Sequence, residues 1–206
     1  MDRADVERLI HSHGWATLVT TGEAGTGAAH VPCLLESPPT DHDDPVDEDL
    51  VILGHTARAD PVSRDIARGR EALLIFQGPH GYISPAWYEA GPYVGTWNYT
   101  SVHVRGVPEV LEGDAGFDVL RRTQSHFEAA MNEPFDLDPV LDFAKAIAAG
   151  TVPFRLVASS VDAKAKLSQD KPREVQDRVM AALERPGPYS QPTLAAEMRR
   201  LKRSSA

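Results

Sequence analysis

The sequence predicts a mostly β protein, an antiparallel barrel with a few peripheral helices packed on it. Three observations support this fold class. About six or seven segments with strand character follow one another at hairpin spacing, and the helical segments are few. Strands and helices do not alternate regularly, which disfavours a parallel doubly wound sheet. At 206 residues the chain suits one domain at 1–185, followed by a basic tail at 186–206.

The first half begins with a helix and then becomes rich in strands. Val6, Leu9 and Ile10 recur at helical spacing, so we expect an amphipathic helix at the start of the chain. The Pro- and Asp-rich segment 37–49 has no apolar period and is expected to be an acidic surface loop or a disordered insertion. The expected elements are a helix at 2–13, a hairpin of strands at 15–21 and 28–36, strands at 50–54 and 72–77, and a short helix at 58–68.

The second half contains one long strand and most of the helices. Residues 96–111 predict a strand with a bend or bulge at Gly106 and Pro108. The run Pro186-Gly187-Pro188 ends the helix before it, so we expect a separate, free helix in the tail. The expected elements are helices at 114–130, 138–149, 172–184 and 194–203, and a last strand at 152–161.

The charge of the chain bears on its partners. The formal net charge is −9, and an acidic surface repels nucleic-acid phosphates, so we expect no broad DNA-binding face. The tail is locally basic and is either a solvated helix end or a contact for DNA or an acidic partner. Its cations are Arg199, Arg200, Lys202 and Arg203.

Several features favour a cytoplasmic protein. No apolar run is long enough to predict a membrane-spanning helix, and the acidic start lacks the order of a secretory signal. The single cysteine, Cys33, cannot form an internal disulfide, which fits a reducing compartment. It stands in an apolar run, so we expect a buried and unreactive side chain.

Familiar catalytic and metal-binding signatures are absent from the sequence. We find no Walker loop, no dinucleotide-binding glycine motif, no nucleophile elbow and no Cys/His cluster with zinc spacing. His11 and His13 would point in different directions on the expected helix. Four other histidines lie in strand or turn segments, where a structural role competes with a catalytic one: His30, His55, His80 and His103.

The segment Gly54–Pro61 carries groups that suit a phosphate monoester. His55, Thr56 and Arg58 offer an imidazole, a hydroxyl and a guanidinium directly after a strand. A planar cation binds two phosphate oxygens at once, and neutral donors complete such a site. The alternative interpretation is a capped turn, in which Asp60 pairs with Arg58 or caps the next helix.

Aromatic residues gather in two later segments. Five of the eight Trp and Tyr residues lie in 82–88 and 96–99, interleaved with polar side chains, Gly and Pro. This mixture suits a pocket wall or a subunit interface, although plain core packing competes with it, above all for Trp97. The segment Lys164–Gln169 adds two cations and two polar donors beside the last strand.

At these segments the sequence resembles the PaiB-like FMN-binding proteins, often labelled negative transcriptional regulators. The resemblance covers most of residues 2–184. Asp60 stands where that family usually has Asn, and 37–49 and the tail look like additions. The matching blocks are His30–Pro32 with Leu34-Leu35, Gly54–Pro61, Phe76–Tyr88, Thr96–Tyr99 with Val102–Val104, and Lys166–Gln169 with Pro172.

The resemblance implies a six-stranded split β-barrel of the pyridoxamine-phosphate-oxidase type, which is an FMN-binding split barrel. It also implies a homodimer that holds FMN in a groove shared by two chains. On this basis His55, Thr56 and Arg58 are expected at the phosphate. The residues expected to border the flavin ring are His30, Val31 and Pro32, and those expected elsewhere in the pocket are Trp87, Asn98, Tyr99, Lys166 and Gln169.

Three functions follow as alternatives. The first is a flavin-binding regulator. Because the chain is acidic, it would regulate through a partner rather than by contacting DNA bases. The second is an FMN-dependent oxidoreductase acting on a small molecule, in which the flavin carries the chemistry. The third is a haem-binding protein with a histidine ligand. The sequence leaves FMN, the deazaflavin F420 and haem open as cofactors.

Overall fold

The computed structural model describes residues 1–37 and 49–204, without the side chains of 202–204. The chain forms two compact units. The larger unit contains Asp2–Phe76 and Val102–Asp162, and the smaller unit contains Met1, Gln77–Ser101 and Ala163–Ala206. The boundary expected between residues 185 and 186 lies inside the smaller unit. The acidic segment is outside the described residues at 38–48.

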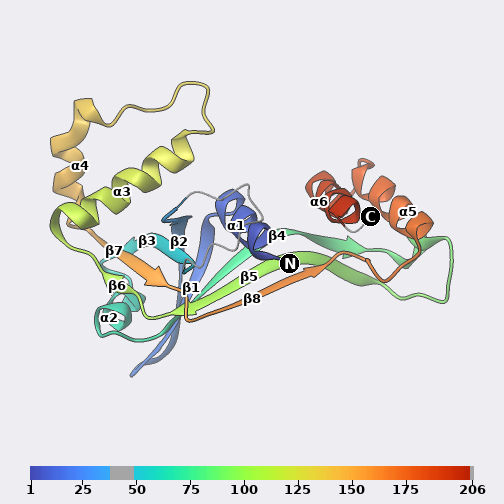
Figure 1. The fold of residues 1–206 in the computed structure, drawn as a ribbon, viewed down its shortest axis with the longest axis horizontal. Helices are drawn as coiled ribbons and strands as arrows, with labels where there is room; N and C mark the ends of the chain where they lie inside the picture. Colours follow the sequence, from blue (N-terminus) through green and yellow to red (C-terminus); the bar gives the residue numbers. More distant parts are fainter. Residues whose placement is uncertain (38–48, 205–206) are drawn as a thin grey trace. The chain divides into compact units, whose positions relative to one another are not determined.

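Eight strands form the sheet in the described part of the chain (Figure 1), and every pair whose register is described is antiparallel. The mostly β, antiparallel fold with helices is therefore confirmed, but with eight strands rather than six. The order across the sheet is β6-β7-β3-β2-β1-β4-β5-β8. The strands are β1 Trp15–Gly22, β2 Gly25–Leu35, β3 Val51–Ala57, β4 Ala72–Ile83, β5 Thr96–Gly106, β6 Glu109–Val110, β7 Thr151–Val157 and β8 Ser160–Lys166.

The higher strand count arises because each of the two last predicted strands is divided. The segment 96–111 breaks at the bend expected from Gly106 and Pro108, giving β5 and β6. A Cβ on Gly106 would lie 2.4 Å from the carbonyl oxygen of Val157, so the chains approach closely there. The segment 152–161 turns before Ser159, whose backbone N–H donates to the carbonyl of Arg105.

Strand β4 continues past the point where the sequence predicts its end. The sequence predicts a strand at 72–77, yet β4 runs through Gly78 and Pro79 to Ile83. The pairing of β4 with β1 ends at Ile75. Proline cannot donate a ladder hydrogen bond, and beyond Ile75 no such donor is needed on the β1 side.

The helices lie close to the expected positions. The side chain of Asp2 caps α1 by accepting from the backbone N–H of Asp5, 2.7 Å away. Helix α3 packs on β7, β3 and β2 of the larger unit, and α2 packs on β1 and β2. The helices are α1 Arg3–Ser12, α2 Pro61–Ala67, α3 Gly113–Glu128, α4 Leu141–Ala148, α5 Arg173–Glu184 and α6 Pro192–Ser204, with short 3-10 turns at η1 Pro85–Tyr88 and η2 Asp138–Val140.

The tail helix differs from the expectation of a free element. The break at Pro186–Pro188 separates α5 from α6, but α6 then packs along α5 in the smaller unit (Figure 1). Its Leu194, Ala195 and Met198 are buried in one apolar cluster with residues of α5. An amphipathic helix next to an apolar cluster gains stability by covering it. The basic residues of the tail therefore belong to a packed helix.

The interior of the larger unit is apolar and closed. Cys33, Ile52 and Phe154 are fully buried there. Burial raises the pKa of the Cys33 thiol far above its usual range, which confirms the expected buried and unreactive side chain.

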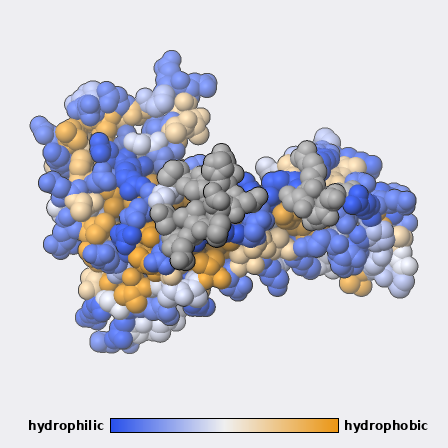
Figure 2. Space-filling view, in the orientation of Figure 1, coloured by the Kyte–Doolittle hydropathy of each residue, from blue (hydrophilic) through white to orange (hydrophobic). Residues whose placement is uncertain are grey.

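Some large apolar side chains remain at the surface. On α4 no residue is buried, and Phe143 and Ile147 are 66% and 57% exposed. Figure 2 shows hydrophobic residues interleaved with hydrophilic ones on one face of the molecule. No helix in the described residues is both long and apolar enough to cross a membrane.

Gly54 on β3 tests the packing of this interior. A Cβ there would lie 2.7 Å from Cζ of Phe154 and 3.0 Å from Sγ of Cys33, both in the closed core. We expect Gly54→Ala to lower the free energy of unfolding by about 1–3 kcal/mol, because overpacking outweighs the entropic gain from alanine. The measurement is urea denaturation.

The control for Gly54→Ala is Gly187→Ala. A Cβ on Gly187 would meet no atom within 4 Å. We expect this variant to stay within about 0.5 kcal/mol of the parent protein. Equal stability of the two variants would contradict the packing argument.

Candidate functional site

The end of β3 carries the residues expected at a phosphate. In the sheet β3 lies between β2 and β7, and its seven residues pair with β7 from Val51↔Val157 to Ala57↔Thr151. This register places the residue after the strand, Arg58, beside the turn that precedes β7. Its backbone N–H donates to the carbonyl of Gly150 at 2.8 Å.

His55 and Thr56 lie on opposite faces of the sheet, because successive residues of a strand alternate. Thr56 shares a face with Gly54, which pairs with Cys33 and Phe154 in the interior. His55 shares the other face with Pro153, its partner on β7. The structure therefore does not bring the His55 imidazole and the Thr56 hydroxyl to one face.

His55 is a neutral imidazole with one nitrogen enclosed. Burial lowers the pKa of His55, because the charged ring loses its hydration. Its Nδ1 is buried and has no hydrogen-bond partner in the described structure. A buried N–H without an acceptor is costly, so the proton of the neutral ring belongs on Nε2. That nitrogen is then a donor available to a ligand.

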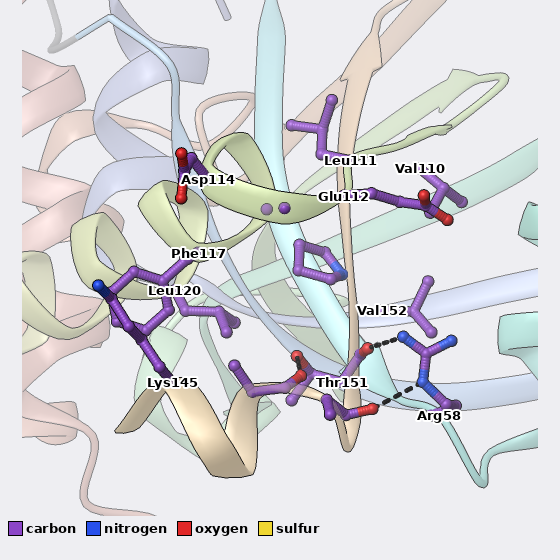
Figure 3. Close-up of a pocket in the computed structure, with 15 residues that line it drawn as sticks. Arg58, Val110, Leu111, Glu112, Asp114, Phe117, Leu120, Lys145, Thr151 and Val152 are labelled. Carbon is purple, nitrogen blue, oxygen red and sulfur yellow. Dashed lines mark hydrogen bonds between the residues drawn. The ribbon is translucent and has the colours of Figure 1, made fainter. Parts of the chain in front are cut away.

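The Arg58 side chain clamps the end of β3 to the turn before β7. Its Nε donates to the carbonyl of Ala149 at 2.7 Å, and one Nη donates to the carbonyl of Thr151 at 2.9 Å (Figure 3). Guanidinium has five N–H donors, so three remain after these two bonds. The side chain is exposed, and its orientation is set by the backbone.

Asp60 has the structural role that the alternative interpretation foresaw. It is the N-cap of α2, and its carboxylate accepts from the backbone N–H of Val62 at 3.1 Å. Ser63 Oγ also donates to the Asp60 carbonyl, at 2.7 Å. Among the described residues Asp60 forms no ion pair with Arg58, so the Asp60 carboxylate does not neutralise the charge of the Arg58 guanidinium.

A cavity of about 390 Å³ opens beside Arg58 in the larger unit. Figure 3 shows Arg58 and Lys145 on opposite sides of it, with Phe117 and Leu120 near Lys145. The volume lies within the ~300–1,000 Å³ typical of small-molecule sites. The lining residues are Arg58, Val110, Leu111, Glu112, Gly113, Asp114, Gly116, Phe117, Leu120, Lys145, Ala148, Ala149, Thr151, Val152 and Pro153.

Most of this lining was not foreseen from the sequence. Lys145 on α4 lies 5.8 Å from the centroid of the Phe117 ring on α3, a cation–π arrangement. Glu112 and Asp114 place two carboxylates at the start of α3. None of these residues belongs to a recognisable motif, and only the packing of α3 and the end of α4 around β7 brings them to Arg58.

The segment expected to border a flavin ring lies next to β3. The carbonyl oxygen of Pro32 is 3.1 Å from the position of a Cβ on Gly54. His30 is exposed and stacks on Trp15, with ring centroids 6.3 Å apart and 20° between the ring planes. Trp15 is 62% exposed, whereas Val31 is buried. His30 and Trp15 thus present a flat aromatic surface on β1 and β2.

The other expected pocket residues all belong to the smaller unit, and most have structural partners there. Trp87 packs against the apolar cluster of α5 and α6. The fully buried Asn98 donates to Ser168 Oγ at 2.9 Å. Gln169 bonds the backbone at both ends, through Leu167 N–H and the Ala165 carbonyl.

Tyr99 and Lys166 are the two members of this group whose side chains are more open. Tyr99 is half-buried, with Lys164 Nζ 5.9 Å from its ring centroid. Lys166 is exposed and donates to Thr96 Oγ1 at 2.5 Å. Both Lys166 and Asn98 line a second cavity, which lies wholly within the smaller unit.

The larger unit has the groups that an FMN phosphate and ring require. Arg58 lines the cavity and retains donors for two phosphate oxygens, and His55, which is not part of the lining, lies on the same sheet face as Pro153. The enclosed, unpartnered nitrogen of His55 fixes which ring nitrogen donates. The residues present therefore fit a flavin phosphate ester.

Comparison with known proteins agrees with this fit. Residues 1–160 match the family described as "Putative FMN-binding domain". The chain is 29% identical over 170 residues to "Protease synthase and sporulation protein PAI 2" of Bacillus subtilis, covering 81% of this chain and 77% of that protein. The resemblance stated from the sequence motifs is thereby confirmed.

Solved structures share the fold at low sequence identity. The FAD and heme binding protein from Mycobacterium smegmatis has a TM-score of 0.57 at 15% identity, over 85% of this chain and 77% of that one. The flavocytochrome Anf3 from Azotobacter vinelandii has a TM-score of 0.57 at 12% identity, over 85% and 73%. At such identities the likeness concerns the fold alone.

The lowered pKa of His55 predicts a dependence of stability on pH. The unfolded chain binds a proton near the ordinary histidine pKa of about 6.5, which the folded ring resists. The free energy of unfolding should therefore fall as the pH drops from about 7 to about 5.5. We expect His55→Gln to remove part of this slope in denaturant titrations at the two pH values.

The variant His126→Gln provides a comparison for the pH dependence measured with His55→Gln. Burial, and then the nearby His11, also lower the pKa of His126, so His126→Gln should remove a separate part of the slope. If the free energy of unfolding of His55→Gln depended on pH as steeply as that of the parent protein, the His55 ring would not be buried in its neutral form.

Proposed function

The chain belongs to the FMN-binding family that residues 1–160 match, and from that premise we propose that it binds FMN. The observation that carries the proposal is the Arg58 guanidinium, held by two backbone carbonyls at the edge of a 390 Å³ cavity. When bound, FMN supplies one- or two-electron chemistry, and the protein contributes binding and orientation.

Arg58 is assigned to the phosphate of FMN. Its clamp to Ala149 and Thr151 fixes the plane of the guanidinium before the ligand arrives. A pre-oriented planar cation loses little side-chain freedom when it binds two phosphate oxygens. Glu112 and Asp114 also line the cavity, and their carboxylates repel a phosphate, so Arg58 is the lining group assigned to it.

His55 is assigned as a second donor to the same phosphate, through Nε2. A neutral N–H can approach a phosphate oxygen without the desolvation cost of another charge. Thr56 was expected at the phosphate too, but its hydroxyl lies on the opposite face of β3, so we assign it to the interior. The phosphate contacts proposed are therefore Arg58 and His55.

The flavin ring is assigned to the segment His30–Pro32 with Trp15. A stacked pair of exposed aromatic rings offers a flat surface of the kind that a planar ring system contacts well. Tyr99 of the smaller unit remains a proposed pocket residue in a dimer, whereas Lys166 lines the second cavity and is assigned there. Trp87, Asn98 and Gln169 have internal bonds and contacts and are assigned a supporting role in the smaller unit.

A regulatory output is the first biological role we propose for the bound flavin. The similarity to PAI 2 of Bacillus subtilis, a protein named for protease synthesis and sporulation, supports it. A net charge of −9 favours action through a protein partner rather than through DNA. The flavin would then report redox state or flavin supply to that partner.

We also propose that the protein is a homodimer with FMN at the subunit interface. The apolar face of α4 supports this, because Phe143 and Ile147 are four residues apart and both are exposed. Contiguous exposed apolar side chains on a helix that buries nothing mark an interaction surface. A second copy of the chain is the simplest partner for it.

The phosphate assignment predicts how affinity depends on the ligand. Wild-type protein should bind FMN at least about tenfold more tightly than riboflavin, which lacks the phosphate. In Arg58→Ala this preference should largely disappear, while riboflavin affinity stays nearly constant. Quenching of flavin fluorescence measures both dissociation constants.

The comparison of two ligands separates binding from folding. If Arg58→Ala only loosened the turn before β7, FMN and riboflavin would lose affinity together. Arg64→Ala on α2 is the matched control, since Arg64 is also exposed and nearby in sequence. An FMN preference that survives in Arg58→Ala would refute the assignment.

The dimer proposal predicts a mass twice that of the 22.4 kDa chain in light scattering after gel filtration. Replacing Phe143 and Ile147 together by Ser should shift the protein toward the monomer. Val107→Ser, at another exposed apolar residue, should leave the mass unchanged. A monomeric wild-type protein would contradict the proposal.

A further inference from the structure

We propose that a cavity in the smaller unit binds a small planar monoanion, such as an aromatic carboxylate, between Lys166 and Tyr93. The cavity has a volume of about 410 Å³, enough for a ligand of that size. Its walls come from the segment after β4, the start of β5 and the end of β8. They are lined by Tyr88, Pro92, Tyr93, Val94, Thr96, Asn98, Lys166, Ser168, Asp170 and Lys171.

The charges of the lining leave one positive charge in excess. Lys166 and Lys171 supply two cations and Asp170 one carboxylate. Asp170 is engaged by Lys171, with Nζ and Oδ2 2.6 Å apart, and this hydrogen bond lowers the pKa of Asp170. The carboxylate is therefore ionised and already paired, and the cavity is complementary to a single negative charge.

Lys166 is the cation that is free to meet the ligand. Its ammonium donates to Thr96 Oγ1, and it forms no salt bridge with any carboxylate in the part of the chain that is described, although its charge also contributes, after Lys171, to lowering the pKa of Asp170. An ammonium has three N–H donors, so two remain for a carboxylate. Because the whole chain carries −9, this local positive site is what lets an anion approach.

The buried polar residues of the lining are held by hydrogen bonds to each other. Ser168 adopts φ 61°, a left-handed conformation uncommon for a residue with a Cβ. Asn98 and Ser168 hold each other through the amide and the hydroxyl, 2.9 Å apart at the closest pair of atoms, and both are buried. A strained residue held by buried partners is typical of a ligand-binding segment.

The remaining lining is largely apolar and partly aromatic. Tyr93 lies 4.9 Å from Tyr88, centroid to centroid, and Lys171 Nζ is 4.7 Å from the Tyr93 centroid. The neighbouring Pro92 and Val94 are exposed and complete an apolar surface. A ligand with a flat apolar body and one carboxylate matches both parts of the lining, whereas inorganic phosphate would leave the apolar part unused.

Benzoate is the probe for this cavity, with benzamide as its uncharged counterpart. Ligand-observed NMR on the full chain without added flavin should show saturable benzoate binding, at least about fivefold tighter than that of benzamide. Equal affinity for the two compounds, or no saturation by benzoate, would overturn the proposal. The measurement does not depend on whether the protein binds FMN.

Charge variants test the assignment with effects of opposite sign. Lys166→Gln should weaken benzoate binding about fivefold or more, whereas Asp170→Asn should strengthen it by releasing Lys171. Lys164→Gln is the matched control, because Lys164 lies on the same strand but does not line the cavity. Equal loss in Lys164→Gln and Lys166→Gln, or weaker binding in Asp170→Asn, would refute the assignment.

Competition separates this cavity from the proposed flavin site. We expect saturating FMN to leave the dissociation constant of benzoate unchanged. Competitive displacement of benzoate by FMN would show that the cavity is part of the flavin site, and the inference of a separate ligand would fall.

Discussion

The pairing of β3 with β7 is the constraint on which the candidate flavin site depends. It places Arg58 beside the turn before β7, so that backbone carbonyls orient the guanidinium, and it sets His55 and Thr56 on opposite faces. Gly54 allows this pairing because a larger residue would meet the Phe154 ring. The groups proposed for the phosphate are therefore positioned by strand pairing and an apolar core rather than by a flexible loop.

The two cavities proposed to bind anions in this acidic chain differ in the charges of their linings. In the larger unit, the lining carries Arg58 and Lys145 together with Glu112 and Asp114, and Arg58 is the group proposed for a phosphate. In the smaller unit, Lys171 neutralises Asp170 and leaves Lys166 in excess. In both, short-range charge arrangement outweighs the net charge of the chain, because Coulomb interactions between exposed groups are screened beyond about 8–10 Å.

The similarity to flavin- and haem-binding structures establishes a fold and leaves the chemistry to individual side chains. Within this chain, the groups that fit a flavin are an oriented guanidinium, a neutral imidazole and a stacked aromatic pair. None of the described residues has been assigned as an acid or base for a substrate.

The sequence by itself determined the local elements and the motif at the end of β3. Apolar periodicity located α1, and strand-like segments at hairpin spacing located β1 and β2, because these features depend on near neighbours. The sequence left the role of Asp60 open between pairing with Arg58 and capping α2, and the structure decided for the cap. Only the tertiary structure divided the long strands, packed α6 on α5, and placed Lys145 by Phe117. Contacts such as Asn98 with Ser168 join residues 70 positions apart, and no local pattern encodes which distant side chains will share a cavity.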